Sequence, residues 1–442
     1  MTSSVERLRE LLRIPTVSHA DEARVEWARF DEFHRALERL YPVLHATLER
    51  EVVDGHSLLY RWPGAAAGRP TVLMAHMDVV PVVEEDWRHP PFGAEVTGEG
   101  EDAEIHARGA IDDKGSLVAI LEAVEELASD GFAPAHDVYL AFGHNEETAG
   151  GGARTIAETL RERGVEPAVV LDEGGAVVDG VIPGVSIPTA MVGVAERGIM
   201  TLVLTARESG GHASTPPPMP ATARLARAID RLQRRPFPVR ISPAVRAMLA
   251  SVAPHAPQPL RWVFEHLSVT GPLVARALAA LGPETNASVR TTAVATRLSG
   301  APGENVLAAT ATAAVNIRLL TGDTVDAAVR RVRRVIADDA IEVGVHRASD
   351  PSPVSPWRGA AWRRVATAVA GALGEDIATL PYLQLGASDS RWFAGICASV
   401  YRFTPFHLTR AERDALHAHD ERIRVGSWLR GIAFYRAFIE AS

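Results

Sequence analysis

The feature that most constrains this chain is a regular alternation of short apolar runs with helical patterns between about residues 70 and 190. Runs of strand length occur at 71–75, 138–142 and 168–171. Between them, apolar residues recur at helical spacing over 116–130 and 155–163. An order of strand, helix, strand, helix, strand is typical of a mostly parallel sheet with helices on both faces. We therefore expect an α/β fold.

The pattern changes near residue 195. Strand patterns follow at 200–206, 289–297, 306–320 and 341–347, and helical patterns at 221–234, 243–252, 270–282 and 324–338. A stretch rich in Pro and Ser at 349–356 predicts a linker, and helices are expected near 359–373 and 425–440. Because 442 residues exceed one ordinary core, we expect an α+β domain at 195–347, inserted into a domain formed by 1–194 and 348–442.

Charge and apolar content restrict the partners. The net charge is −9, without a long basic run, which argues against nucleic acid or an anionic membrane as a partner. The chain has no apolar run of about eighteen residues, so no membrane span is predicted. The first eighteen residues mix charged and apolar side chains as an amphipathic helix does, unlike a signal peptide. Because Cys397 is the only cysteine in the sequence, a disulfide within the chain is impossible. We expect a cytoplasmic protein.

Acidic and histidine side chains follow the three predicted strands of the first sheet. In chain order the pairs are His76 and Asp78, Glu146 and Glu147, and Asp172 and Glu173. Asp112 and Asp113 stand just before a predicted helix. Since the carboxyl ends of parallel strands meet at one edge of a sheet, these groups are expected to converge there. Imidazole and carboxylate groups together are typical ligands of zinc.

Several longer motifs surround these residues. They are His76–Pro81, Arg108–Gly115, Glu146-Glu147, Leu171–Gly174, Gly211–Ser214, and Tyr401–Pro405 followed by His417. With them the chain resembles the zinc exopeptidases and deacylases of the ArgE/DapE, carboxypeptidase G and aminoacylase group. Within that group it is most similar to carboxypeptidase S and related N-acyl-amino-acid hydrolases. The resemblance runs from Leu11 nearly to the C-terminus, and it makes 195–347 a lid or dimerisation domain and the remainder the catalytic domain.

The resemblance also implies a pair of zinc ions in each subunit, which Co²⁺ or Mn²⁺ can replace. His76 and Asp172 would bind one ion, Glu147 and His417 the other, and Asp112 would bridge them. Asp78 would orient His76. Glu146 would act as the general base toward a water held between the metals. In related enzymes the Asp112–Asp113 peptide is cis.

The second histidine ligand has competitors, because the chain contains sixteen histidines. His407 and His419 are close alternatives to His417. The related pattern is Leu-His or Ile-His before a small residue and a terminal Glu, and Leu416–Glu421 matches it. We therefore choose His417.

The inserted domain is expected to contact the substrate. In the family, the histidine that corresponds to His212 stabilises the tetrahedral oxyanion, often from a partner subunit, so a homodimer through the inserted domain is expected. Asn305, Arg318 and Gly386 match substrate-binding positions. The segment 236–286 lengthens the inserted domain, and three interpretations stay open: an apolar acyl pocket, an altered dimer contact, or plain packing.

The resemblance favours a hydrolase that cleaves an amide bond beside a free carboxylate, in a small peptide or an N-acyl amino acid. Carboxypeptidase and deacylase reactions share this geometry, so the sequence does not separate them, and the reverse condensation is also conceivable. One alternative is an aminopeptidase with the same metals, which needs an acidic group for a free amine. Another is a catalytically inactive binding or dimerisation relative. In an inactive relative we would expect a metal ligand or Glu146 to be missing from the sequence, and all of these residues are present.

Overall fold

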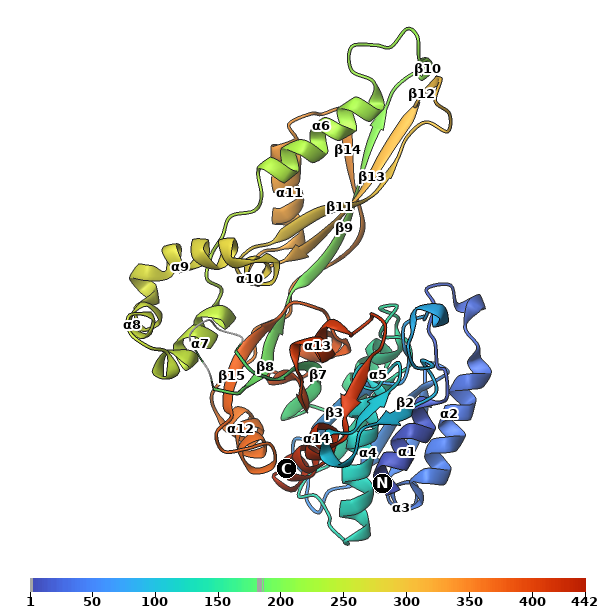
Figure 1. The fold of residues 1–442 in the computed structure, drawn as a ribbon, viewed down its shortest axis with the longest axis vertical. Helices are drawn as coiled ribbons and strands as arrows, with labels where there is room; N and C mark the ends of the chain where they lie inside the picture. Colours follow the sequence, from blue (N-terminus) through green and yellow to red (C-terminus); the bar gives the residue numbers. More distant parts are fainter. Residues whose placement is uncertain (1–2, 181–184, 186) are drawn as a thin grey trace.

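Figure 1 shows a computed structural model of the chain, in which residues 3–180, 185 and 187–442 are described. A larger part holds both termini, and an arm built from a small sheet and two helices extends away from it (Figure 1). Across the described residues, every helix is too short or too polar to span a bilayer.

The larger part is built on a mostly parallel sheet, as predicted. Its described strands lie in the order β1-β2-β6-β3-β7-β16-β8-β15. Their bounds are β1 Glu49–Val53, β2 Ser57–Trp62, β3 Thr71–His76, β6 Val138–Gly143, β7 Val169–Val178, β8 Thr189–Glu196, β15 Ala378–Gln384 and β16 Val400–His407. The central neighbours β6, β3, β7 and β16 run parallel, as do β8 and β15. Strands β1 and β2 extend one edge in antiparallel pairing.

Helices cover both faces of this sheet, because alternate side chains of its strands point to opposite sides. On β3, Leu73 and Ala75 join the core that contains α4 and α14, whereas Val72 and Met74 pack with α5. The helices around the sheet are α1 Ser3–Leu12, α2 Trp27–Leu40, α3 Pro42–Thr47, α4 Lys114–Ser129, α5 Gly152–Glu162, α12 Ala360–Ala372, α13 Arg410–Asp414 and α14 Val425–Glu440. The predicted α/β fold is confirmed.

A small antiparallel sheet joins distant parts of the chain. Its described strands have the order β17-β5-β4, with bounds β4 Glu95–Thr97, β5 Glu104–His106 and β17 Arg422–Arg424. Because Ile423 pairs with Ile105, the segment before β17 is held beside the loop between β5 and α4. Those two segments contain His417 and Asp112.

The arm is an antiparallel sheet covered on one face by two helices. Its described strands have the order β11-β13-β9-β14. The bounds are β9 Gly198–Arg207, β11 Thr292–Ser299, β13 Thr310–Leu319, β14 Ile341–Ser349, α6 Ala221–Arg234 and α11 Val325–Ile336, with the short pair β10 Gly211–His212 and β12 Val306–Leu307 at the tip. Alternate residues of β9 are buried, and they pack against α6 and α11. The domain boundaries 1–194, 195–347 and 348–442 stay a prediction.

The segment that we expected to lengthen the inserted domain forms four helices, which pack together and against the large sheet through α7. They are α7 Pro243–Val252, α8 Leu260–Glu265, α9 Leu267–Leu281 and α10 Pro283–Val289. Leu249, Phe264 and Val274 join the same apolar core as the large sheet, and α7 lies against β15. Helical spacing showed which face is apolar but not which element that face packs against.

Candidate metal centre and active site

Asp112 lies between two histidines that come from distant parts of the chain. One carboxylate oxygen, Oδ1, is 3.0 Å from Nε2 of His76, which ends β3. The other oxygen, Oδ2, is 3.0 Å from Nε2 of His417. His417 is also 3.0 Å from Oε2 of Glu147, which follows β6. The structure thus forms two potential ligand groups that share Asp112.

Asp78 orders the neighbourhood of His76 and of the two glutamates. Its buried carboxylate lies 3.3 Å from Nδ1 of His76, which also lies 2.9 Å from the Asp78 carbonyl oxygen. The two carboxylate oxygens accept the backbone N–H groups of Glu146 and Glu147, at 3.1 and 3.2 Å. One side chain therefore fixes both the imidazole and the turn that presents the glutamates.

Glu421 holds the two loops of the centre together. Its fully buried carboxylate accepts the backbone N–H groups of Gly109, Ile111 and Asp112, and Nη1 of Arg108 lies 2.6 Å from it. The loop of Asp112 is thereby tied to the segment that contains His417. The sequence pattern included Glu421 only as the end of a motif, and this positioning contact was not predicted. The Asp112–Asp113 peptide is cis, in agreement with the resemblance.

The structure brings Glu173, and not Asp172, to the metal centre. Oε1 of Glu173 is 3.8 Å from Nε2 of His76, and Glu173 completes a group with His76 and Asp112. The carboxylate of Asp172 points to the other side of β7, where it accepts the backbone N–H of Ser390 at 2.8 Å. Successive strand side chains alternate between the two faces, so neighbours cannot both face the site. The geometry therefore favours Glu173 as a ligand, and the choice of Asp172 stays a prediction.

An isosteric pair of substitutions separates these two residues. We expect Glu173→Gln to lower the bound metal from two ions per chain to about one, because a neutral amide is a poor ligand for a divalent cation. Asp172→Asn retains its acceptor for Ser390 and is expected to keep both ions. Elemental mass spectrometry of the metal-loaded variants measures the content directly. A loss of metal in Asp172→Asn with none in Glu173→Gln would restore the original choice.

The competing histidines lie elsewhere. Nε2 of His407 is 2.8 Å from Oδ2 of Asp179, and Nε2 of His419 is 3.8 Å from Oδ2 of Asp86. Neither belongs to a potential ligand group among the described residues. The preference for His417 over these two agrees with the geometry.

The centre suits divalent cations, because its carboxylates carry more negative charge than the neighbouring side chains neutralise. Burial, together with nearby carboxylates, raises the pKa of Glu146 and Glu173 well above the usual range. The same causes raise the pKa of Asp389 to about 7. Oε1 of Glu147 is buried and has no hydrogen-bond partner among the described residues. Imidazole and carboxylate donors around this charge fit two divalent ions, with Asp112 between them.

His212 and Asn305 lie at the tip of the arm, away from this centre. They are neighbours there, because the Ala213 N–H donates to the Asn305 carbonyl oxygen at 3.0 Å, and both are exposed. His212 lies beyond the far end of the ten-residue strand β9, which starts beside the large sheet. That strand spans roughly 30 Å. Within one chain, the structure does not bring these two residues to Asp112.

Arg318 lies at the opposite end of the arm, where it belongs to a cluster of arginines. It pairs with Ile199 near the start of β9. Burial and the charge of Arg391 lower the pKa of Arg318, and burial with the charge of Arg318 lowers that of Arg197 to about 10. None of these three arginines forms an ion pair with a described acidic residue. This positive charge, which Asp389 offsets only near Arg391, is suited to an anion such as a substrate carboxylate.

Gly386 lies in the exposed loop after β15 and lines a cavity of about 260 Å³. Gly174, which follows Glu173, and Leu416, which precedes His417, line the same cavity. The predicted substrate-binding loop therefore borders a space that opens beside the metal centre.

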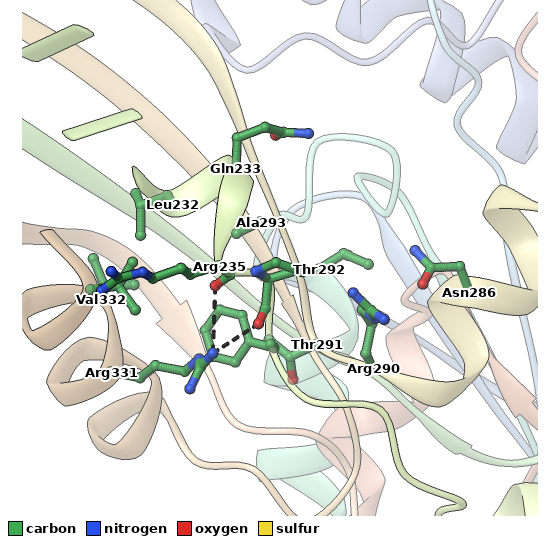
Figure 2. A pocket seen from close by; sticks show the side chains of 13 residues that line it. Leu232, Gln233, Arg235, Asn286, Arg290, Thr291, Thr292, Ala293, Arg331 and Val332 are labelled. Carbon is green, nitrogen blue, oxygen red and sulfur yellow. Dashed lines mark hydrogen bonds between the residues drawn. The ribbon is translucent and has the colours of Figure 1, made fainter. Parts of the chain in front are cut away.

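A separate pocket in the arm lacks the chemistry of this site. It has a volume of about 300 Å³ and lies between α6, β11 and α11 (Figure 2). Arg235, Arg290 and Arg331 line it, and the guanidinium of Arg331 donates to the Pro236 carbonyl oxygen at 2.8 Å. Its lining includes no acidic or histidine side chain. The candidate active site is therefore the centre around Asp112.

Comparisons with known proteins place this geometry in a family. The family model described as "Peptidase family M20/M25/M40" matches residues 72–441. The N-fatty-acyl-amino acid synthase/hydrolase PM20D1 of Xenopus tropicalis is 35% identical, covering 99% of this chain and 85% of that relative. The probable carboxypeptidase S-like 2 of Dictyostelium discoideum is 31% identical, covering 98% of this chain and 84% of the relative.

Solved structures show the same fold. An M20 family metallo-carboxypeptidase from Sulfolobus solfataricus superimposes with a TM-score of 0.71 at 17% identity, over 100% of this chain and 99% of the other. A dinuclear metal-binding M20 peptidase from Bacillus subtilis gives a TM-score of 0.62 at 14% identity, over 99% and 96% of the two chains. The resemblance inferred from the motifs is confirmed.

Proposed function

Because the chain belongs to the peptidase family M20/M25/M40, a family of metal-dependent hydrolases, we propose that its substrates are N-acyl amino acids. The reaction is metal-dependent hydrolysis of an amide bond beside a free carboxylate. The observation that carries it is the pair of ligand groups that share Asp112, with Glu146 adjacent to one of the ligands. N-acyl amino acids are preferred over peptides because relatives named for N-fatty-acyl-amino acids match nearly the whole chain.

The geometry of the two ligand groups supports an assignment of residues to the two ions. We assign His76, Asp112 and Glu173 to one ion, and Asp112, Glu147 and His417 to the other. Zn²⁺ is the proposed metal, with Co²⁺ or Mn²⁺ as substitutes. When bound, the two ions supply polarisation of the scissile carbonyl and acidification of water.

Glu146 is the proposed general base. Its backbone is fixed by Asp78, and its half-buried side chain is adjacent in the chain to the ligand Glu147. From this position it takes the proton of the attacking water and returns a proton to the leaving amine. Asp78 acts through its neighbours and is a positioning residue.

The arginine cluster supports recognition of the acid end of a substrate rather than the amine end. Arg318 and Arg197 form no ion pair with a described acidic residue, and Arg391 lies near both Arg318 and Asp389. Such a cluster attracts a carboxylate and repels the free amine that an aminopeptidase must bind. The ligands and Glu146 are all present, which argues against an inactive relative.

Arg318→Ala tests the contact with the carboxylate. We expect KM for an N-acyl amino acid to rise about 10- to 100-fold, the loss of a charge-assisted hydrogen bond worth about 1.5–3 kcal/mol. Arg297→Ala, an exposed arginine of the same sheet, is the matched control and should leave KM unchanged. The wild type should also prefer the free acid over the C-terminal amide of the same substrate. If the acid and the amide are hydrolysed equally and Arg318→Ala leaves KM unchanged, recognition of the substrate carboxylate is rejected.

A homodimer is part of the proposal. His212 and Asn305 lie roughly 30 Å along the arm from its base, so a second copy is the simplest source of these side chains at the site. Val294 and Leu298 on the edge strand β11 are exposed apolar residues that suit a contact between two arms. His212 would then donate to the oxyanion of the partner's substrate. The cytoplasmic localisation stays a prediction.

A further inference from the structure

A second cavity lies beside the active site, under the helices that pack against β15. It has a volume of about 370 Å³ and is walled by α7, α8, α9 and α10, with Met191 of β8 and Tyr382 of β15 on its inner side. Of its sixteen lining residues, twelve are aliphatic, methionine or phenylalanine. The polar exceptions besides Tyr382 are Glu284, Thr285 and Ser288, all from α10. A cavity of this size and lining is suited to an apolar ligand.

The apolar cavity adjoins the smaller cavity at the loop of Gly386. Four residues line both this cavity and the 260 Å³ cavity at the loop of Gly386: Met191, Glu284, Tyr382 and Leu385. The smaller cavity is bordered by Gly174 and Leu416, the chain neighbours of Glu173 and His417. A ligand that passes between these four side chains would reach from beside the metal ligands into the apolar cavity.

The combined size distinguishes an acyl chain from an amino-acid side chain. The combined volume of the two cavities would hold about twenty water molecules, at about 30 Å³ each. An amino-acid side chain has fewer atoms than the two cavities together can hold. A long unbranched chain can fill both.

The wall built by α9 has the pattern of a surface for such a chain. Leu273, Val274, Ala277, Leu278 and Leu281 all line the cavity, and their spacing places them on one stripe of the helix. Leu273 and Leu281 are 68% and 62% exposed. Large apolar side chains that stay exposed at the rim of an apolar cavity are typical of a binding site.

We propose that the cavity under α7–α10 binds the long apolar acyl chain of the substrate, and so selects N-acyl amino acids with long acyl groups. This inference rests on the proposed function, which it deepens by assigning the acyl group to a particular site. It decides among the three interpretations of residues 236–286 in favour of the acyl pocket.

Chain length is the first test. The wild type is assayed with acetyl, hexanoyl, dodecanoyl and hexadecanoyl derivatives of one amino acid. Each methylene that is buried should raise kcat/KM by about fourfold until the cavity is filled. Ala277→Trp places an indole in the cavity and should lower the dodecanoyl-to-acetyl ratio of kcat/KM at least about tenfold. Ala280→Trp is the matched control, on the same helix at an exposed position outside the lining, and should keep the wild-type ratio.

A binding measurement separates failure of the pocket from failure of the reaction. Dodecanoate is titrated calorimetrically into the wild type and both variants, and Ala277→Trp alone should weaken its Kd about tenfold or more. If no acyl derivative is hydrolysed but dodecanoate binds in this way, the proposed function fails and the pocket stands. If hydrolysis is independent of chain length and dodecanoate does not bind, the pocket is rejected and the function stands. A flat chain-length profile combined with a changed sedimentation coefficient of Ala277→Trp would instead make α9 a contact between copies.

Discussion

Replacement of Glu146 by glutamine is expected to lower kcat by about 10²–10⁴-fold, the usual contribution of a general base. The amide has nearly the same shape as the carboxylate, so the contacts of its backbone with Asp78 should persist. It cannot accept a proton from water, and both proton transfers are lost. Because Glu146 belongs to neither ligand group, the metal content should stay at two ions per chain.

The kinetic pattern and a control make this result specific. We expect kcat and kcat/KM to fall together, since the lost interaction acts in the transition state. Glu158→Gln, a half-exposed glutamate on α5, should leave both constants unchanged. Wild-type kcat in Glu146→Gln would remove the general base from the account. Loss of metal in this variant would make Glu146 a ligand instead.

Asp112→Ala is expected to have the largest effect of any single substitution. Each oxygen of Asp112 faces a different histidine, so the substitution removes a shared ligand from both groups at once. We expect loss of both ions under conditions in which the wild type retains them. Because polarisation by the metal is worth several kcal/mol, kcat/KM should fall by about 10⁴-fold or more.

Two measurements separate lost chemistry from lost structure. Elemental analysis reports the metal content, and circular dichroism reports the fold, which should persist because Asp112 lies in a loop at the sheet edge. Asp86→Ala, a substitution of an exposed aspartate, should keep both ions and wild-type activity. Retention of both ions in Asp112→Ala would show that this carboxylate is not shared.

Much of the site was predictable because the strand ends are visible in the sequence. The apolar runs of β3 and β6 locate His76 and Glu147 at one sheet edge, and the motif around Leu416 identified His417 among sixteen histidines. The choice between Asp172 and Glu173 depends on which face of β7 each side chain takes. Strand residues alternate between faces, and on β7 Glu173 shares a face with Leu171, which packs toward α4. The same alternation places Asp172 on the face of Val170, so the strand pattern alone leaves both residues open.

Other features depend on contacts that the sequence does not specify locally. Strands β8 and β15 were not predicted, and their interiors contain Gly193 and Pro381, which weaken a strand pattern. The extension helices show a clear apolar stripe, but whether it faces the arm or the large sheet depends on tertiary packing. The position of Glu421 between two loops depends on the pairing of β17 with β5, which is separated by more than three hundred residues.

The central claim is that two metal ions lie on either side of Asp112. Anomalous X-ray diffraction at the zinc absorption edge, from crystals grown with zinc, tests it most directly. We expect one peak in contact with His76 and Glu173, a second in contact with Glu147 and His417, and both in contact with Asp112. A single peak, or a pair that does not share Asp112, would contradict the account.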